Sequence, residues 1–314
     1  MIRNSPDRNR SSAPTGMRPL GRFVLPVPAG MELTATWFRI NRISVEEIPW
    51  RRGPGQRDSL SALRESIGAQ EGAWSGERTF PGGWEERDAS ELCGVPAMLL
   101  CTNGRRADHN IDVHIGLPDV ILRLTENRPF DICGECLTPH GPILNLSRHY
   151  RHGCEGVSPD SFFLATGRIE GLGTWSEQAG ASLDRPADGG RPRIHLTFTT
   201  HLFARPCDPP RIIEAVKPAA SKYRISLEVL RSQIRPLAGM KGLEEVYILR
   251  PRDESGDGCP RFTACWEYEG IGGDPERPHI ELKMTCRAEA LEDALRMWDE
   301  VMTNFVPVRK YSFP

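Results

Sequence analysis

Three of the nine cysteines and three of the eight histidines lie in one short stretch, DICGECLTPHGPILNLSRHYRHGC, which starts at Asp131. A structural zinc site needs four ligands that converge on one ion, and these usually come as two closely spaced pairs. Cys133 and Cys136 supply one pair. The second pair would come from His140, His149, His152 and Cys154, none of which forms a usual partner pair. His149 and His152 are the candidates, because a three-residue spacing on a helix permits both rings to lie on one face. A metal site built from the two cysteines and these two histidines is one interpretation of the stretch.

Two other interpretations compete with the metal site. A redox pair needs CxxC at the start of a helix, where the helix dipole lowers the thiol pKa, but Pro129 and Pro139 flank this pair and indicate a turn. The favoured interpretation is ordinary thiols or a local disulfide. We therefore expect no cofactor, with structural zinc as the alternative.

The chain lacks the short sequence motifs that are typical of common enzyme active sites. It contains no GxSxG elbow, HExxH, Walker loop or complete GxGxxG. We expect a protein that is not an enzyme. The rival hypothesis is a zinc-stabilised or thiol-dependent enzyme that uses the cluster at 133–154.

A second stretch, AWSGERTFPGGWEERD from Ala73, has the composition of a protein-binding surface. Tryptophan and arginine are enriched among the residues that dominate binding energy at interfaces. The alternative is that the rings fold back onto a sheet, since large aromatic side chains are usually buried. The candidate partner-binding residues are Trp74, Arg78, Trp84, Glu85, Arg87 and Trp175.

The composition excludes some classes of partner. With 40 basic and 42 acidic residues, the chain has no global field to attract nucleic acid or an anionic membrane. Apolar runs are only strand-sized, so we expect no insertion into a membrane. Residues 1–19 are polar, carry four arginines and lack an apolar core, which predicts a disordered tail rather than a secretory signal.

The hydrophobic pattern predicts an α+β fold of two domains. In the first, at 20–205, we expect strands in 21–50, a helix that starts at Leu60 and closes at Gly68 and Gly72, an exposed loop at 74–88, and a strand meander from 95 to 127. Further strands are expected in 160–171 and 191–203. The proline-rich stretch 206–220 predicts a linker without regular structure.

The second domain, at 221–314, shows clearer periodicity. Strand patterns occur at 227–239, 244–251, 261–270 and 279–286, and a helical pattern follows from Arg287 until Pro307 stops it. Trp266 and Trp298 fall on the apolar faces of a strand and of this helix. Both are expected in the core rather than at an interface.

Four blocks of this second domain carry a resemblance: LRSQIRPLAGMKGLEEVYIL, FTACWEYEG, PHIELKMTC and ALRMWDEVMTNFVPVRKY. In this order they resemble the immunity proteins that neutralise phospholipase effectors of bacterial type VI secretion. GRFVLPVP from Gly21 and SFFLATGRIEG from Ser161 resemble earlier strands of the same family. The matching positions in the four blocks are Arg235, Ala238, Gly239, Gly242, Glu244, Glu245, Phe262, Trp266, Glu267, Gly270, Pro278, Met284, Thr285, Trp298, Asp299 and Arg309.

The resemblance implies a fold and a function. The fold would be two α+β domains arranged as a claw, each a largely antiparallel sheet with one or a few packed helices. The function would be to bind and inhibit a cognate secreted phospholipase or lipase and so protect the producing cell. It implies a periplasmic location, although the chain shows no signal peptide, so a cytoplasmic location is the alternative. A non-inhibitory effector adaptor is a further alternative.

Overall fold

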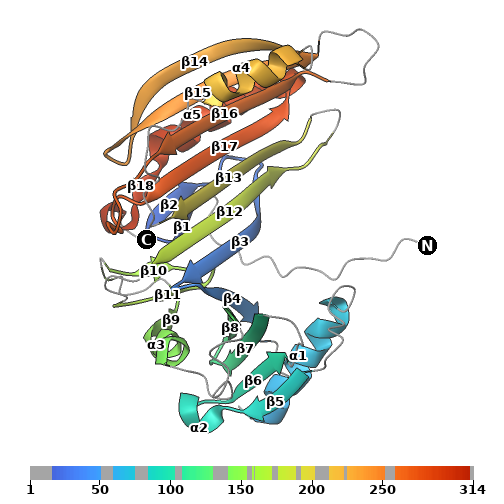
Figure 1. The fold of residues 1–314 in the computed structure, drawn as a ribbon, viewed down its shortest axis with the longest axis vertical. Coiled ribbons are helices and arrows are strands. Elements are labelled where there is room, and N and C mark those ends of the chain that lie inside the picture. Colours follow the sequence, from blue (N-terminus) through green and yellow to red (C-terminus); the bar gives the residue numbers. More distant parts are fainter. Residues whose placement is uncertain are drawn as a thin grey trace, which may run out of the picture.

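The computed structural model describes residues 16–50, 59–74, 84–102, 108–129, 141–153, 158, 160–171, 176–188, 192–201, 212–222, 225–251 and 259–311. A curved sheet of 12 strands runs the length of the molecule (Figure 1). In spatial order its strands are β14 (Ile225–Leu237), β15 (Met240–Pro251), β16 (Arg261–Tyr268), β17 (His279–Arg287), β13 (Ile194–His201), β12 (Glu177–Arg185), β3 (Glu32–Ile40), β4 (Ile43–Pro49), β8 (Val120–Pro129), β7 (Asp108–Gly116), β6 (Ala97–Thr102) and β5 (Trp84–Asp88). Every neighbouring pair is antiparallel.

Shorter elements surround this sheet. Two three-stranded sheets are formed by β1 (Met17–Leu20), β2 (Phe23–Pro26) and β18 (Val306–Pro307), and by β9 (Tyr150–His152), β10 (Phe162–Phe163) and β11 (Gly167–Ile169). The helices are α1 (Leu60–Trp74), α2 (Ser90–Cys93), α3 (Gly141–His149), α4 (Ile212–Lys222) and α5 (Leu291–Asn304), with 3-10 turns at Ala288–Ala290 and Val308–Lys310. None of the described helices is long and apolar enough to span a bilayer.

The alternating pattern of β13 explains its place in the middle of the sheet. Ile194, Leu196 and Phe198 are fully buried on one face, while the intervening threonines and histidines are half-buried on the other. The buried face joins the main core, where the ring of Phe198 packs edge-on against Phe305 at 5.6 Å between ring centroids. Such a strand needs cover on one face only.

Helix α5 supplies much of that cover. Its buried residues, Ala294, Met297, Trp298, Val301 and Met302, recur at three- and four-residue steps and pack against β17 and β2. The helix ends at Asn304 because Phe305 turns into an extended conformation. Pro307 then lies in β18, so the predicted stop falls close to the observed end.

The sheet passes without a break across the predicted domain boundary. β13 pairs with β17 over its full length, from Ile194 opposite Cys286 to His201 opposite His279. The fold is α+β with antiparallel strands, as expected, but both halves of the chain contribute to one sheet. The prediction of a structureless linker at 206–220 is wrong for the part that forms α4, which packs on β14 and β15.

Three other local predictions are wrong. Met17–Leu20 forms β1, so the end of the predicted 1–19 tail pairs with β2, while residues 1–15 lie outside the described residues. Helix α1 continues past both glycines to Trp74, held by its packing on β6. Trp84–Asp88, expected in a loop, forms β5 because β6 offers it a free edge.

Candidate functional site

One face of the large sheet is covered by helices only at its two ends. Glu245 of β15 accepts a hydrogen bond from the backbone N–H of Ile213, at 3.0 Å, which places α4 on this face. At the other end, Leu63 and Ile67 of α1 pack in one cluster with Leu100 of β6. The rows of paired residues that connect the two ends show that both helices lie on the same side.

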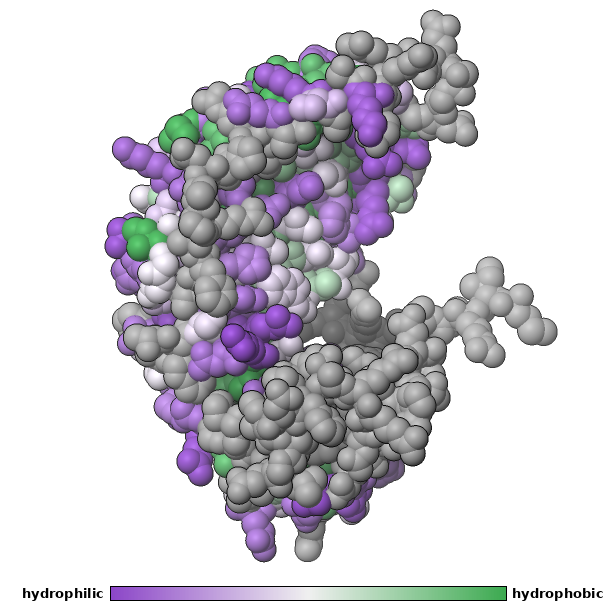
Figure 2. Space-filling model, in the orientation of Figure 1, coloured by the Kyte–Doolittle hydropathy of each residue, from purple (hydrophilic) through white to green (hydrophobic). Residues whose placement is uncertain are grey.

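Between these helices lies what we call the central face, formed by the outward residues of β17, β13, β12 and β3. Among the described residues, no helix covers it, whereas α5 packs on the opposite side of β17. Figure 2 shows the molecule hollowed on one side at mid-height, between its upper and lower parts. A concave sheet face flanked by helices is suited to receive a protein surface.

Trp37 is the most prominent side chain of the central face. Its ring is 41% exposed and lies over Gly180 of β12, where a Cβ atom would approach the indole to 2.2 Å. Glycine at position 180 therefore provides the space in which the ring lies flat against the sheet. An exposed tryptophan with a supported orientation is a typical anchor of a protein interface.

The half-buried His201 extends this aromatic surface and packs against the buried His279. The ring of His201 lies 6.2 Å from Trp37 and 5.7 Å from His279, centroid to centroid. The Nε2 atom of His279 lies 2.9 Å from a carboxylate oxygen of Glu267, which orients the imidazole. Trp37, His201 and His279 thus form a row that crosses β3, β13 and β17.

A polar cluster borders the row. The carboxylate of Asp184 accepts hydrogen bonds from Thr34, Arg193 and His195. Burial alone would raise the pKa of Asp184, but these hydrogen bonds outweigh it and hold the pKa below its usual value. The central face therefore combines an apolar anchor with oriented hydrogen-bonding groups.

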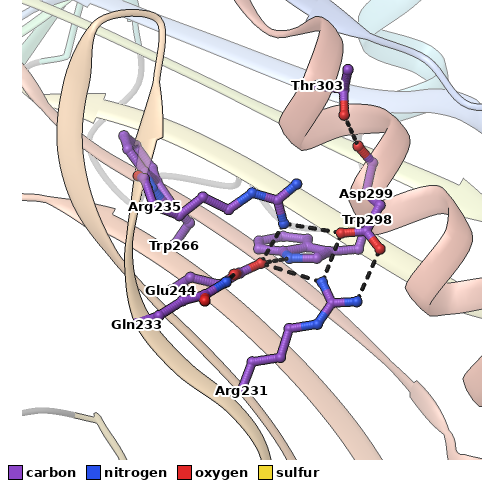
Figure 3. A network of polar contacts seen from close by, with 8 residues as sticks. All are labelled: Arg231, Gln233, Arg235, Glu244, Trp266, Trp298, Asp299 and Thr303. Carbon is purple, nitrogen blue, oxygen red and sulfur yellow. Dashed lines mark hydrogen bonds and ion pairs between the residues drawn. The ribbon is translucent and has the colours of Figure 1, made fainter.

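A different polar cluster lies on the other face, between the β14–β15 hairpin and α5 (Figure 3). Glu244 is fully buried and accepts hydrogen bonds from Gln233, Arg235 and Trp298. Asp299 accepts from Arg231 at 2.7 and 3.0 Å and from Arg235 at 2.9 Å. We call this set the hairpin–helix network.

The network keeps both of its acids charged. Burial would raise the pKa of Glu244, but its three donors lower it. The hydrogen bonds from Arg231 hold the pKa of Asp299 low against a smaller effect of burial. Trp266 and Trp298, predicted in the core, are fully buried, and the indole of Trp266 donates to the carbonyl of Arg235.

The four predicted partner-binding residues that fall in described elements do not lie in the strands of the central face. Trp74 ends α1, and Trp84, Glu85 and Arg87 lie in β5, at the far edge of the sheet. Arg87 is half-buried, and it is the one of the six whose side chain is described. Arg78 and Trp175 lie outside the described residues, so their role stays a prediction.

The predicted metal site is only partly described. Cys133 and Cys136 lie outside the described residues. His149 is the last residue of α3 and His152 lies in β9, so the prediction that both share a helical face is wrong. In the described part of the chain, no group of three or more histidine, cysteine, aspartate or glutamate residues could hold a metal ion. The zinc and redox hypotheses stay predictions.

Sequence reasoning missed the central face. Its one local signal was in β3, where Trp37 and Arg39 alternate with the buried Phe38 and Ile40. That alternation places a tryptophan on the face opposite the core. Gly180, which supports the ring, lies in a strand that the sequence pattern did not reveal.

The fold as a whole resembles that of solved structures. None of the protein-family models matches the chain, and no curated protein matches it. Among solved structures, the apo immunity protein TplEi of the type VI secretion system from Pseudomonas aeruginosa aligns with a TM-score of 0.65, over 93% of this chain and 96% of that chain. The chain has the fold of this immunity protein.

Two further structures support the assignment of the fold. A chain in the crystal structure of the Tle4–Tli4 complex aligns with a TM-score of 0.67, over 94% of this chain and 98% of that one. TplEi in complex with an "L" peptide aligns with a TM-score of 0.63. The sequence identities are only 15–16%, so these alignments establish the fold and not the residues of a binding site.

Proposed function

We propose that this protein is an immunity protein, which binds and inhibits a cognate phospholipase or lipase effector of a type VI secretion system. The observation that carries the proposal is the alignment of nearly the whole chain with an immunity protein of that system. The sequence resemblance from Leu230 to Tyr311 points independently to the same family and to the phospholipase class of effector.

The central face is the surface that we assign to the effector. A specific interface buries about 1,600 Å² in total, and a few aromatic or arginine anchors supply most of its free energy. Trp37 is such an anchor, and the neighbouring His201 and the Asp184 cluster supply oriented polar groups. The helices α1 and α4 at the two ends would confine the bound surface.

Inhibition requires no chemistry from this chain. A protein that occludes the active site of a lipase, or holds its lid shut, needs a rigid complementary surface and no nucleophile. The proposed place of action is the periplasm, where such an inhibitor would protect the phospholipids of the cell's own membranes.

The test is an inhibition assay with the lipase encoded beside this gene. Excess purified protein should abolish hydrolysis of a phospholipid substrate, and the two proteins should co-elute. A complex that forms without loss of hydrolysis would support the adaptor hypothesis instead. If the two proteins form no complex and hydrolysis is not inhibited, the proposed function is refuted.

A further inference from the structure

The two edge strands of the large sheet differ in how well they are protected against pairing with another chain. Edge strand β5, WEERD, has five residues, of which four are charged. Edge strand β14 has thirteen residues and exposes Val229, Leu230 and Ile234 by 45%, 36% and 63%. Among the described residues only five large hydrophobic side chains are exposed, and three of them lie on β14. Figure 2 shows hydrophobic surface at the top of the molecule, where Figure 1 places β14 and α4.

The arginines of β14 do not protect this edge. Arg231 and Arg235 point toward α5 and are held by Glu244 and Asp299 in the hairpin–helix network. A long edge strand with exposed apolar side chains and unpaired backbone groups is a template for another strand. The β14 edge is therefore a candidate site for pairing with another strand.

The register of β14 shows which side chains such a strand would meet. A bulge between Val229 and Arg231 leaves Leu230 without a position opposite β15. As a result, Val229, Ser232 and Ile234 share the face that carries α4. The face that carries α5 also carries Glu228, Arg231, Gln233 and Arg235.

We propose that β14 pairs with β14 of a second copy of this chain, antiparallel, with a two-fold axis through Ser232. In this register the two Ser232 side chains meet at the axis, where identical residues must face each other and small uncharged ones fit. Val229 of each copy lies opposite Ile234 of the other, and Glu228 lies opposite Arg235. Arg231 lies opposite Gln233, with Leu230 as the extra residue of the bulge on each strand.

The pattern is therefore complementary to itself. Apolar side chains are opposed to apolar ones on one face, Glu228, which also pairs with Arg250 of its own chain, is opposed to Arg235 on the other, and no like charges are directly opposed. A one-residue shift would bring side chains of opposite faces together, which disfavours that register. Because the contact uses the same surface on both copies, it closes as a dimer, and the charged β5 edge does not extend it.

The first test is the mass in solution. Sedimentation or light scattering of the full chain should give twice the 35.1 kDa chain mass. Ile234→Lys places an ammonium group opposite Val229 and should raise the dimer dissociation constant at least about tenfold. Ile271→Lys, at an exposed residue between β16 and β17, is the matched control and should leave the dimer intact. A monomer at all concentrations, or a dimer unaffected by Ile234→Lys, would overturn the proposal.

The second test locates the axis. Ser232→Cys should be captured as a covalent dimer by a short thiol crosslinker, because directly opposed residues have Cβ atoms about 5 Å apart. Ser226→Cys is the control, since the proposed register separates its two copies by about 30 Å. The wild-type chain corrects for the native thiols, including the exposed Cys259. Equal yields from the two variants would refute the register.

The dimer is independent of effector binding. Trp37 lies on the central face, and Ile234 lies on the edge strand. Ile234→Lys should therefore yield a monomer that still inhibits the lipase, so failure of one proposal leaves the other standing.

Discussion

The hairpin–helix network and the central face are two polar regions of one sheet, and they differ in whether their main side chains are bonded within the chain or open to solvent. In the network, Arg235, Glu244, Trp298 and Asp299 bond to one another around the fully buried Glu244 and Trp298, with Arg235 and Asp299 on the solvent side. On the central face, Trp37 is 41% exposed beside half-buried histidine and threonine side chains. The first arrangement holds two elements together, and the second leaves a large aromatic side chain open to solvent.

The two regions also differ in how many of their residues belong to the positions that carry the family resemblance. Of the network residues, Arg235, Glu244, Trp298 and Asp299 are among the positions that carry the resemblance, as expected where a buried carboxylate depends on its partners, whereas Arg231 and Gln233 are not. Trp37, Gly180 and His201 are not among these positions either. The aromatic anchor of the proposed effector surface therefore lies outside the positions that carry the resemblance.

The largest expected effect is on the network. Glu244→Ala leaves the buried indole N–H of Trp298 without its acceptor, removes one acceptor from Arg235 and from the exposed Gln233, and should lower the free energy of unfolding by about 3 kcal/mol. Urea unfolding followed by tryptophan fluorescence measures it. Glu281→Ala, at a half-buried acid of the central face, should change stability by only about 0.5 kcal/mol. Equal effects would erase the distinction between the two regions.

The next effect separates binding from stability. Trp37→Ala should weaken effector binding about 30-fold, equivalent to about 2 kcal/mol, because a central aromatic anchor is lost. Its free energy of unfolding should change by less than about 1 kcal/mol, since the ring is not in the core. Calorimetric titration with the effector, together with urea unfolding, gives both quantities. A stability loss without a binding loss would reverse the assignment.

A smaller effect is expected beneath the tryptophan. Gly180→Ala places a methyl group where the indole of Trp37 lies and should tilt the ring away, weakening effector binding about fivefold. Ser182→Ala, two residues along the same strand and on the same face, is the control and should bind as the wild type does. If both variants bind equally well, the orientation of Trp37 is unimportant.

The smallest effect is a dependence on pH. Because the folded-state pKa of Glu244 is lowered, its stabilising contribution is present above the usual value of 4.5 and is lost as the pH falls through the folded-state pKa. The stability gap between the wild type and Glu244→Gln should therefore be constant above about pH 5 and shrink below pH 4.5.

Acids outside the hairpin–helix network do not disturb this measurement. Burial raises the pKa of Glu47 and of Glu177, which gives the opposite dependence on pH, but both residues are present in both variants and cancel in the difference. Urea unfolding at a series of pH values measures the gap. A gap that stays constant in acid would show that Glu244 is not held as a carboxylate by its donors.

Sequence periodicity located most of the large sheet and α5, but not every element. Phe262, Ala264 and Trp266 alternate with less apolar neighbours, and the strand follows that pattern. β12 was missed because EQAGASLDR contains small residues whose burial comes from its neighbours β3 and β13. α4 was missed because local proline density outweighed a weak apolar pattern, whereas packing on β14 stabilises the helix around Pro218.

By itself the sequence determined what depends on near neighbours in the chain: the alternating strands, the apolar face of α5, and the burial of Trp266 and Trp298. Only the tertiary structure decided which surface remains open. The central face exists because α1 and α4 lie at its ends and α5 lies on the opposite side, and these helices come from distant parts of the chain. The pairing of β13 with β17 is equally non-local, since hydrogen bonds between strands carry no signal in the spacing of residues along either one.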